Sequence, residues 1–234
     1  MTYDFDTPVD RSGTYSLKWE EAGDALPMWV ADMEFQTAPQ IRAALQQRLD
    51  HGIFGYSIVP PEWNQTYVDW WRRRHNLDID PESLVFCTGV VPAISSMVRK
   101  LTTANENVLI QTPVYNIFFN SIINNGCRVL ESPLAYDGSG HYSINWADLE
   151  SKLADPQTTL MILCNPHNPV GRIWDRDTLA RIGELCWNNH VTVISDEIHC
   201  DLTDPGYDYV PFASVNEQCA MNSVTCMAPT KTFN

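Results

Sequence analysis

From about residue 84 onward, short apolar runs alternate with longer stretches in which polar and apolar residues mix. The runs predicted to be strands are Leu84–Cys87, Val108–Ile110, Arg128–Leu130, Leu160–Cys164, Val191–Ser195 and Val224–Met227. The stretches predicted to be helices are Pro92–Leu101, Tyr115–Asn124, Trp146–Leu153 and Asp175–Asn189. This rhythm predicts an α/β fold, with a mainly parallel sheet covered by helices on both faces. In such sheets, ligands bind beyond the carboxyl ends of the strands.

The first 83 residues follow a different pattern. They begin with an irregular arm and continue with a predicted helix at Pro39–Asp50, which Gly52 can end. A second predicted helix, Pro61–His75, is rich in tryptophan.

Composition narrows the class of protein. The chain has 234 residues, enough for a sizeable core, and 44% of them are hydrophobic. No apolar run approaches the roughly 20 residues that span a bilayer, and the N-terminus does not resemble a signal peptide. The seven cysteines form no CxxC pair, so we interpret them as free thiols of a cytoplasmic protein rather than as disulfides or zinc ligands. A net charge of −14 argues against a surface that binds nucleic acid or anionic membranes.

Two predicted strands end in loops with distinctive chemistry. After Leu84–Cys87, Gly89 forms a turn that opens a helix, where exposed backbone N–H groups attract phosphate. The simpler reading is an ordinary glycine turn. After Leu160–Cys164, the loop Asn165–Arg172 contains two Asn-Pro pairs, which hold the Asn168 amide in a rigid position. The simpler reading is a rigid turn stabilised by this asparagine.

The two remaining strand ends carry charged residues. Asp196 directly follows an apolar strand, so its carboxylate must find a partner. A helix cap or a structural salt bridge would satisfy it, and so would a protonated ring nitrogen. Lys231 follows the last predicted strand, where desolvation would make its amine a nucleophile for aldehydes. An exposed lysine after a strand is, however, common.

Taken together, these strand ends offer a combination that none of them offers alone. Gly89 supplies a phosphate cradle, Asn168 an amide for a phenolic oxygen, Asp196 an acid for a pyridine nitrogen, and Lys231 an amine for an aldehyde. These are the groups that pyridoxal 5′-phosphate requires. We identify no metal ligand set.

The sequence resembles the fold-type I pyridoxal-phosphate enzymes, the superfamily of class I and II aminotransferases. It is most similar to the MalY/PatB branch, the cystathionine β-lyases and cysteine-S-conjugate β-lyases. The stretches that carry the resemblance are LPMWVADMEFQTAP, HGIFGYS, TPVYNIFF, CNPHNPVGRIW, VISDEIHCDL and APTKTFN, in that order from about Leu26 to the last residue.

The resemblance implies a role for each residue around the cofactor. Lys231 would form the Schiff base, Asp196 would pair with the pyridinium nitrogen, and Asn168 would bind the 3′-oxygen. The backbone amides of Gly89, Val90 and Val91 would hold the phosphate. Tyr115 would stack on the pyridine ring, although without the resemblance it would be read as a core aromatic on a helix face.

The resemblance also implies contacts further from the ring. Tyr56 would reach the phosphate of the partner subunit, which implies a homodimer. His199 stands where many aminotransferases have a tyrosine, so it is either a cofactor contact or a histidine in a capped turn. Trp29, Val30 and Ala31 would line the substrate entrance, although Trp29 reads equally well as a buried anchor of the arm.

The expected domain organisation has two parts. Residues 1–50 would form the N-terminal arm and part of a small domain, and residues 51–234 a pyridoxal-phosphate-binding domain that is incomplete at its C-terminus. Members of the family continue beyond the lysine with a strand and a C-terminal small domain, which supplies the arginine that binds the substrate carboxylate. We therefore expect this chain to be truncated and to have little activity by itself.

The function that the resemblance implies is a carbon–sulfur β-lyase, which cleaves an amino-acid thioether to thiol, pyruvate and ammonia. A class I or II aminotransferase would use the same residues. A non-catalytic fragment or binding protein of the same fold is the third hypothesis, based on the missing carboxylate-binding domain.

Overall fold

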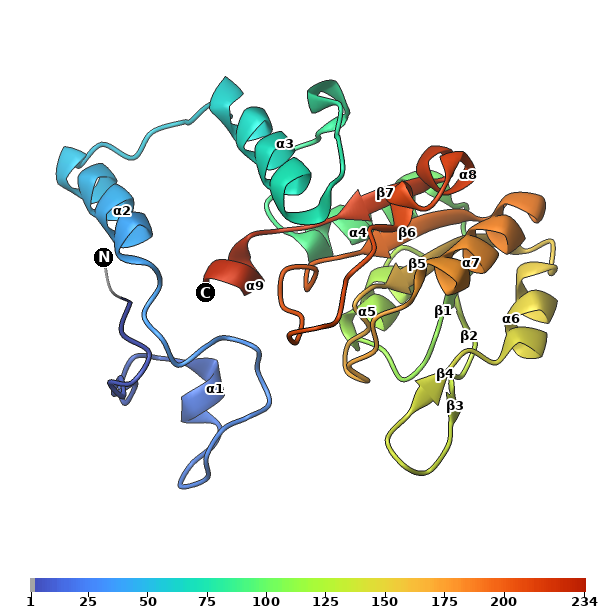
Figure 1. Cartoon of the computed structure of the whole chain (residues 1–234), viewed down its shortest axis with the longest axis horizontal. Coiled ribbons are helices and arrows are strands. Elements are labelled where there is room, and N and C mark those ends of the chain that lie inside the picture. The colour runs from blue at the N-terminus through green and yellow to red at the C-terminus, as the bar shows by residue number, and fades with distance from the viewer. Residues whose placement is uncertain (1–2) are drawn as a thin grey trace. The chain divides into compact units, whose positions relative to one another are not determined.

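The computed structural model describes residues 3–234, which form two units (Figure 1). One unit combines the residues up to Ile58 with Pro229–Asn234, and the other is Val59–Ala228. The domain boundary predicted between residues 50 and 51 stays a prediction. Among residues 3–234, no helix is both long enough and apolar enough to cross a membrane.

The larger unit is built on a five-stranded sheet with the order β2-β1-β5-β6-β7. All its pairings are parallel, as the alternating pattern predicted. The strands are β1 (Asn107–Ile110), β2 (Arg128–Glu131), β5 (Thr158–Cys164), β6 (Thr192–Asp196) and β7 (Ser223–Cys226). Each lies within two residues of its predicted position.

Helices cover both faces of this sheet (Figure 1), which confirms the predicted fold class. On one face, α4 (Val90–Leu101) and α5 (Ile117–Ile123) pack against the side chains of Leu160, Ile162 and Ile194. On the other, α6 (Trp146–Leu153) and α7 (Arg176–Asn188) pack against alternate residues of the same strands, such as Met161 and Leu163. Successive strand residues point to opposite faces, so a strand buried on both sides must be apolar throughout.

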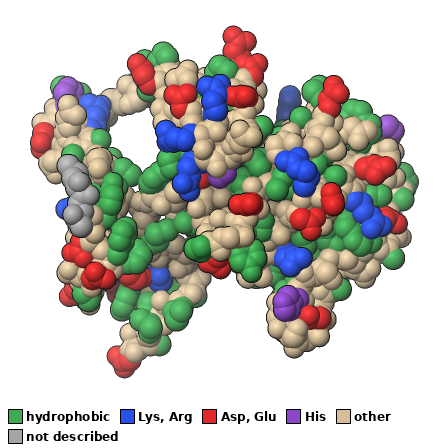
Figure 2. Space-filling model, in the orientation of Figure 1, with side chains coloured by type: hydrophobic (Ala, Val, Ile, Leu, Met, Phe, Trp, Pro, Cys, Tyr) green, Lys and Arg blue, Asp and Glu red, His purple; other side chains and the backbone are tan. Residues whose placement is uncertain are grey.

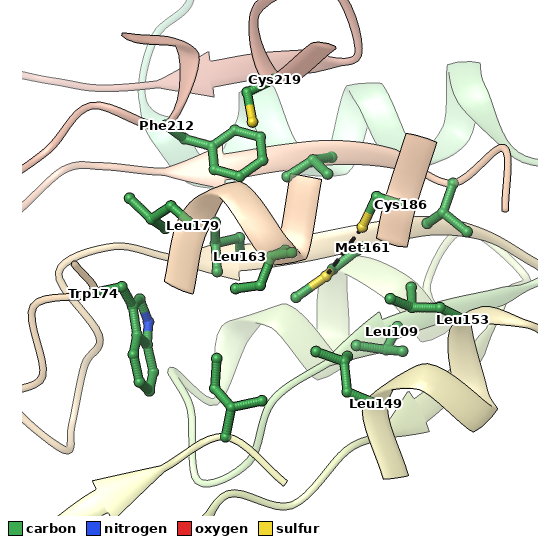
Figure 3. Packing of buried hydrophobic residues seen from close by; sticks show 14 of the residues in the cluster. Leu109, Leu149, Leu153, Met161, Leu163, Trp174, Leu179, Cys186, Phe212 and Cys219 are labelled. Carbon is green, nitrogen blue, oxygen red and sulfur yellow. Dashed lines mark hydrogen bonds between the residues drawn. The ribbon is translucent and has the colours of Figure 1, made fainter. Parts of the chain in front are cut away.

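The core beneath α6 and α7 is shown in Figure 3. Leu109, Leu149 and Leu153 pack at one end of it, and Phe212 and Cys219 at the other. The Cys186 thiol lies 3.8 Å from the sulfur of Met161. The unit also contains the 15-residue helix α3 (Pro61–His75). Short elements complete it: η1 (Pro81–Ser83), η2 (Phe212–Ser214), α8 (Glu217–Met221), and the hairpin of β3 (Ala135–Tyr136) and β4 (Tyr142–Ser143).

One predicted strand is wrong. Leu84–Cys87 forms no ladder, and the side chain of Val85 is 85% exposed. A strand is stabilised by hydrogen bonds to a neighbouring strand, and within the described chain this segment has none to pair with. The hairpin of β3 and β4 was not predicted, since each of its strands has only two residues.

The smaller unit contains α1 (Leu17–Glu20), α2 (Pro39–His51) and α9 (Thr230–Phe233). Helix α2 begins at a proline, whose missing N–H costs nothing in the first turn. It ends at Gly52, as predicted, where the backbone turns to a φ of 74° and the Gly52 N–H bonds to the Leu49 carbonyl.

The distribution of charged side chains and cysteines follows from the fold. On the face seen in Figure 2, acidic and basic side chains are intermixed, with no extended basic patch. All seven cysteines are free thiols, and six of them are buried. Cys87 is the exception, because the segment that carries it is exposed instead of lying inside the sheet.

Candidate active site

Asp196 is the last residue of β6 and lies at the carboxyl edge of the sheet, between β5 and β7. In the parallel register, Cys164 of β5 is its partner on one side and Cys226 of β7 its partner on the other. Residues paired in this way point to the same face, which here is the face covered by α4 and α5. The Asp196 side chain is 5% exposed, and one of its oxygens accepts a hydrogen bond from the Ile198 N–H at 3.2 Å.

Two thiols and a second carboxyl group lie next to Asp196. Burial, reinforced by the nearby Asp196 charge, raises the pKa of the Cys164 and Cys226 thiols far above their ordinary value. Burial also raises the pKa of Glu197 to about 8. The Asp196 carboxylate thus lies between two thiols that stay protonated.

Glu197 ties the end of β6 to the loop before η2. Its Oε1 accepts hydrogen bonds from the Ser195 hydroxyl at 2.7 Å and from the Phe212 N–H at 3.0 Å. The Tyr209 hydroxyl donates to Oε2. The side chain is completely buried. These contacts hold the backbone on which Asp196 lies.

The loop after β5 is held by its own backbone and by the strand beside it. The His167 N–H donates to the Arg172 carbonyl at 2.7 Å, and the Asn165 N–H donates to the Asp196 carbonyl at 2.9 Å. The Asn168 N–H donates to the Cys164 sulfur at 3.4 Å, so Asn168 and Asp196 share one neighbour. The rigid turn read from the two Asn-Pro pairs is therefore present.

A cavity of about 530 Å³ lies beside this loop. Asn168 and His199 both line it, and Arg172, Asp204 and Tyr207 contribute charged and polar groups. Nearby, burial lowers the pKa of His167 to about 4, so this ring is neutral, and its Nε2–H donates to the Pro113 carbonyl at 3.0 Å.

The predicted phosphate cradle lies at the start of α4. Gly89 is the residue before the helix, Val90 is its buried first residue, and Val91 is 37% exposed. The first N–H groups of an α-helix have no partner within the helix, so they are available to an anion. Tyr115 is half-buried and packs against the same apolar cluster as Val90, with Phe118 edge-on at 5.8 Å.

The larger unit thus gathers most of the predicted site at one edge of one sheet. Gly89, Val90, Val91, Tyr115 and Asp196 lie on the face covered by α4 and α5, and Asn168 and His199 line the adjoining cavity. Their individual roles stay predictions.

The other predicted residues belong to the smaller unit. Lys231 is half-buried in α9, and its approach to Asp196 stays a prediction. Tyr56 is fully exposed. Trp29 is 57% exposed, and its Nε1–H donates to the Lys18 carbonyl at 3.3 Å, so it is attached to the arm without being buried. Val30 is half-buried and Ala31 is exposed.

These residues fit pyridoxal 5′-phosphate by the chemistry of their donors and acceptors. A buried carboxylate flanked by two protonated thiols suits a protonated ring nitrogen. The start of a 12-residue helix suits a phosphate. A half-buried tyrosine on the same face suits an aromatic ring.

A second polar cluster lies outside this site. His75 Nε2 and Asp201 Oδ1 are 2.9 Å apart, and the Trp70 Nε1–H donates to both oxygens of Asp201, at 3.2 and 3.1 Å. His75, Cys200 and Asp201 place ligand atoms within 4.8 Å of one another. Burial raises the pKa of the Cys200 thiol strongly, which opposes its ionisation. We therefore read the cluster as a link between α3 and the turn after β6.

The comparisons with known proteins decide the family. The family described as aminotransferase class I and II matches residues 27–233. The chain belongs to this family. Cystathionine β-lyase PatB of Bacillus subtilis (strain 168) is 48% identical over 236 residues, covering 98% of the chain and 61% of PatB. The chain thus spans about three fifths of the length of this relative.

Solved structures of family members agree closely with the fold. A pyridoxal-phosphate-bound putative aminotransferase from Clostridium difficile 630 has a TM-score of 0.95 and 45% identity. Cystalysin from Treponema denticola, whose structure contains pyridoxal 5′-phosphate, has a TM-score of 0.94 and 38% identity. Both cover 100% of the chain, which in turn covers 61% of each.

Sequence reasoning missed the two thiols that flank Asp196 and the anchoring role of Glu197. The thiols are visible in the sequence only as apolar strand residues, and their position depends on the register of three strands. The anchoring role of Glu197 did have a signal in the sequence. Asp196 and Glu197 are two adjacent acids after a buried strand, and both need partners.

Proposed function

We propose that the whole protein is a pyridoxal 5′-phosphate-dependent carbon–sulfur β-lyase, which converts an amino-acid thioether to thiol, pyruvate and ammonia. The observation that carries the proposal is the buried Asp196 carboxylate at the carboxyl edge of the sheet, in a chain 48% identical to a cystathionine β-lyase. When bound, the cofactor would supply an electron sink for the carbanion formed at the substrate Cα.

The chain's own residues would perform the remaining tasks. Asp196 would hold the proton on the ring nitrogen, because a buried carboxylate is stabilised by a positively charged hydrogen-bond donor. The N–H groups of Gly89, Val90 and Val91 would bind the phosphate. Tyr115 would pack on the ring.

The other predicted contacts complete the site. Asn168 would donate to the phenolic oxygen, and His199 would lie beside it, since both line the same cavity. Lys231 would attach the cofactor covalently and then, as a free amine, move the proton at the substrate Cα. Trp29, Val30 and Ala31 would border the entrance.

We further propose that the protein works as a homodimer in which Tyr56 reaches the phosphate bound by the partner subunit. The complete exposure of the Tyr56 side chain supports this, because it leaves the phenol available to another chain. Tyr56→Phe should weaken cofactor retention while leaving the fold intact.

An aminotransferase is the second candidate, supported by the structural match to a putative aminotransferase. The two activities differ in their co-substrate. A lyase releases pyruvate from L-cystathionine without an added keto acid, whereas an aminotransferase needs an amino acceptor. Transfer of the amino group to an added keto acid, with no release of pyruvate, would reject the lyase.

Cofactor attachment is tested separately. The purified holoenzyme should absorb in the visible region, and borohydride reduction followed by peptide mapping should place the cofactor on Lys231. Lys231→Ala should lose the visible band, with Lys100→Ala, an exposed lysine on α4, as the matched control. A band that persists in Lys231→Ala would place the attachment elsewhere.

A further inference from the structure

The short helix that carries Lys231 is followed by an asparagine that binds the backbone of the N-terminal arm. The Asn234 side-chain oxygen accepts a hydrogen bond from the Met33 N–H at 2.8 Å. Its Nδ2 donates to the Phe35 carbonyl at 2.9 Å and to the Met33 carbonyl at 3.2 Å. One amide group thus satisfies three backbone groups, much as a neighbouring β-strand would.

A second contact holds the residue before it. The Thr37 hydroxyl donates to the Phe233 carbonyl at 2.7 Å. The Phe233 N–H in turn donates to the Pro229 carbonyl at 3.0 Å, which closes the helical turn around Lys231. The C-terminal end of this turn is therefore fixed to residues 33–37.

The stretch of arm that Asn234 binds is itself well anchored. Glu34, between the two bound residues, pairs with Lys18 at 2.7 Å and accepts from the Trp19 Nε1–H at 3.1 Å. Lys18, which is 7% exposed, also donates to the Asp32 carbonyl at 2.8 Å. Arg11 pairs with Asp32 at 2.6 Å. Asn234 thus holds the lysine segment against a fixed backbone.

We propose that Asn234 is a positioning residue for Lys231, holding the lysine helix in register with the arm that also carries Trp29, Val30 and Ala31. The role in catalysis rests on the proposed function, but the contact itself does not. An amide is required because it combines an acceptor for one N–H with donors for two carbonyls. Aspartate has nearly the same shape, but one of its carboxylate oxygens would face those two carbonyl oxygens and repel them.

The contact is tested first in the protein without cofactor. Hydrogen exchange at the Met33 amide should be slow in the wild type and at least about fivefold faster in Asn234→Ala, as expected when a hydrogen bond of ordinary strength is lost. Asn188→Ala, at an exposed position of α7, is the matched control and should leave this amide unchanged. Equal exchange in wild type and Asn234→Ala would overturn the proposal.

The positioning role is tested by the chemistry of the lysine. The cofactor-free protein is mixed with pyridoxal 5′-phosphate and reduced with borohydride at intervals, and labelling is followed at Lys231 and at Lys100. We expect labelling of Lys231 to slow at least about fivefold in Asn234→Asp, since small misplacements of reacting groups are costly. Labelling of the exposed Lys100 should not change.

Thr37→Val is a second variant, which removes the bond to Phe233 without introducing charge, and it should slow Lys231 labelling in the same direction. Circular dichroism and thermal melting identify any variant that has simply lost its fold. Normal Lys231 labelling in all these folded variants would overturn the proposal. Absence of Lys231 labelling in the wild type would instead reject the proposed function, while the exchange measurement would still decide whether the contact exists.

Discussion

The buried Glu197 should make the stability of the protein depend on pH in a defined direction. Its carboxyl group has no exposed surface, and burial raises its pKa from 4.5 to about 8. The folded protein therefore binds a proton that the unfolded chain has released. Since the folded pKa is the higher one, the stabilisation is fully present below pH 4.5 and is lost as the pH rises towards 8.

The size of the effect follows from the shift. Each pH unit between the two pKa values changes the free energy of unfolding by about 1.4 kcal/mol. Glu197→Gln keeps the shape and removes the titration. Between pH 5 and pH 8, the wild type should therefore lose up to about 3–4 kcal/mol relative to this variant.

The assay is urea denaturation followed by tryptophan fluorescence at pH 5, 6, 7 and 8. Glu184→Gln, on the exposed surface of α7, is the matched control and should follow the wild type at every pH. A constant difference between wild type and Glu197→Gln would show that the group does not titrate in this range. Such a constant difference would mean that the three hydrogen bonds from Ser195, Tyr209 and Phe212 outweigh burial and keep the carboxylate charged throughout this range.

Three further predictions concern the site, the core and the thiols. Asp196→Asn should retain the fold but lose most activity. Cofactor binding should weaken by about 1.5–3 kcal/mol, as measured by dialysis and visible absorbance. Near-normal turnover would mean that Asp196 only caps the end of its strand. Gly183→Ala should cost about 1–3 kcal/mol of unfolding free energy in urea melts, since the added methyl group would overpack α7 against α8. The added Cβ would collide with the Cys219 sulfur, so adding Cys219→Ala should recover part of the loss. An unaffected Gly183→Ala variant would contradict the packing. A thiol reagent should modify Cys87 quickly and the six buried cysteines slowly, as mass spectrometry can show; several fast thiols in the folded protein would contradict the burial.

The sequence alone determined most of the larger unit. The strands β1, β5 and β6 were predicted to within two residues, because a parallel strand buried on both faces must be apolar along its whole length. Asn168 and Asp196 stood out because polar residues directly after such strands fall at the edge where ligands bind. The family resemblance then supplied roles that spacing could not.

Only the tertiary structure decided the features that depend on pairing between distant segments. Leu84–Cys87 has the composition of a strand but lacks a neighbour, and hydrogen bonding to a neighbour is not encoded in the segment itself. The position of Asp196 between two neutral thiols results from the register of three strands. The contacts of Asn234 join residues about 200 positions apart. No local pattern predicts them, because the amide and the backbone groups that it binds come together only in the folded chain.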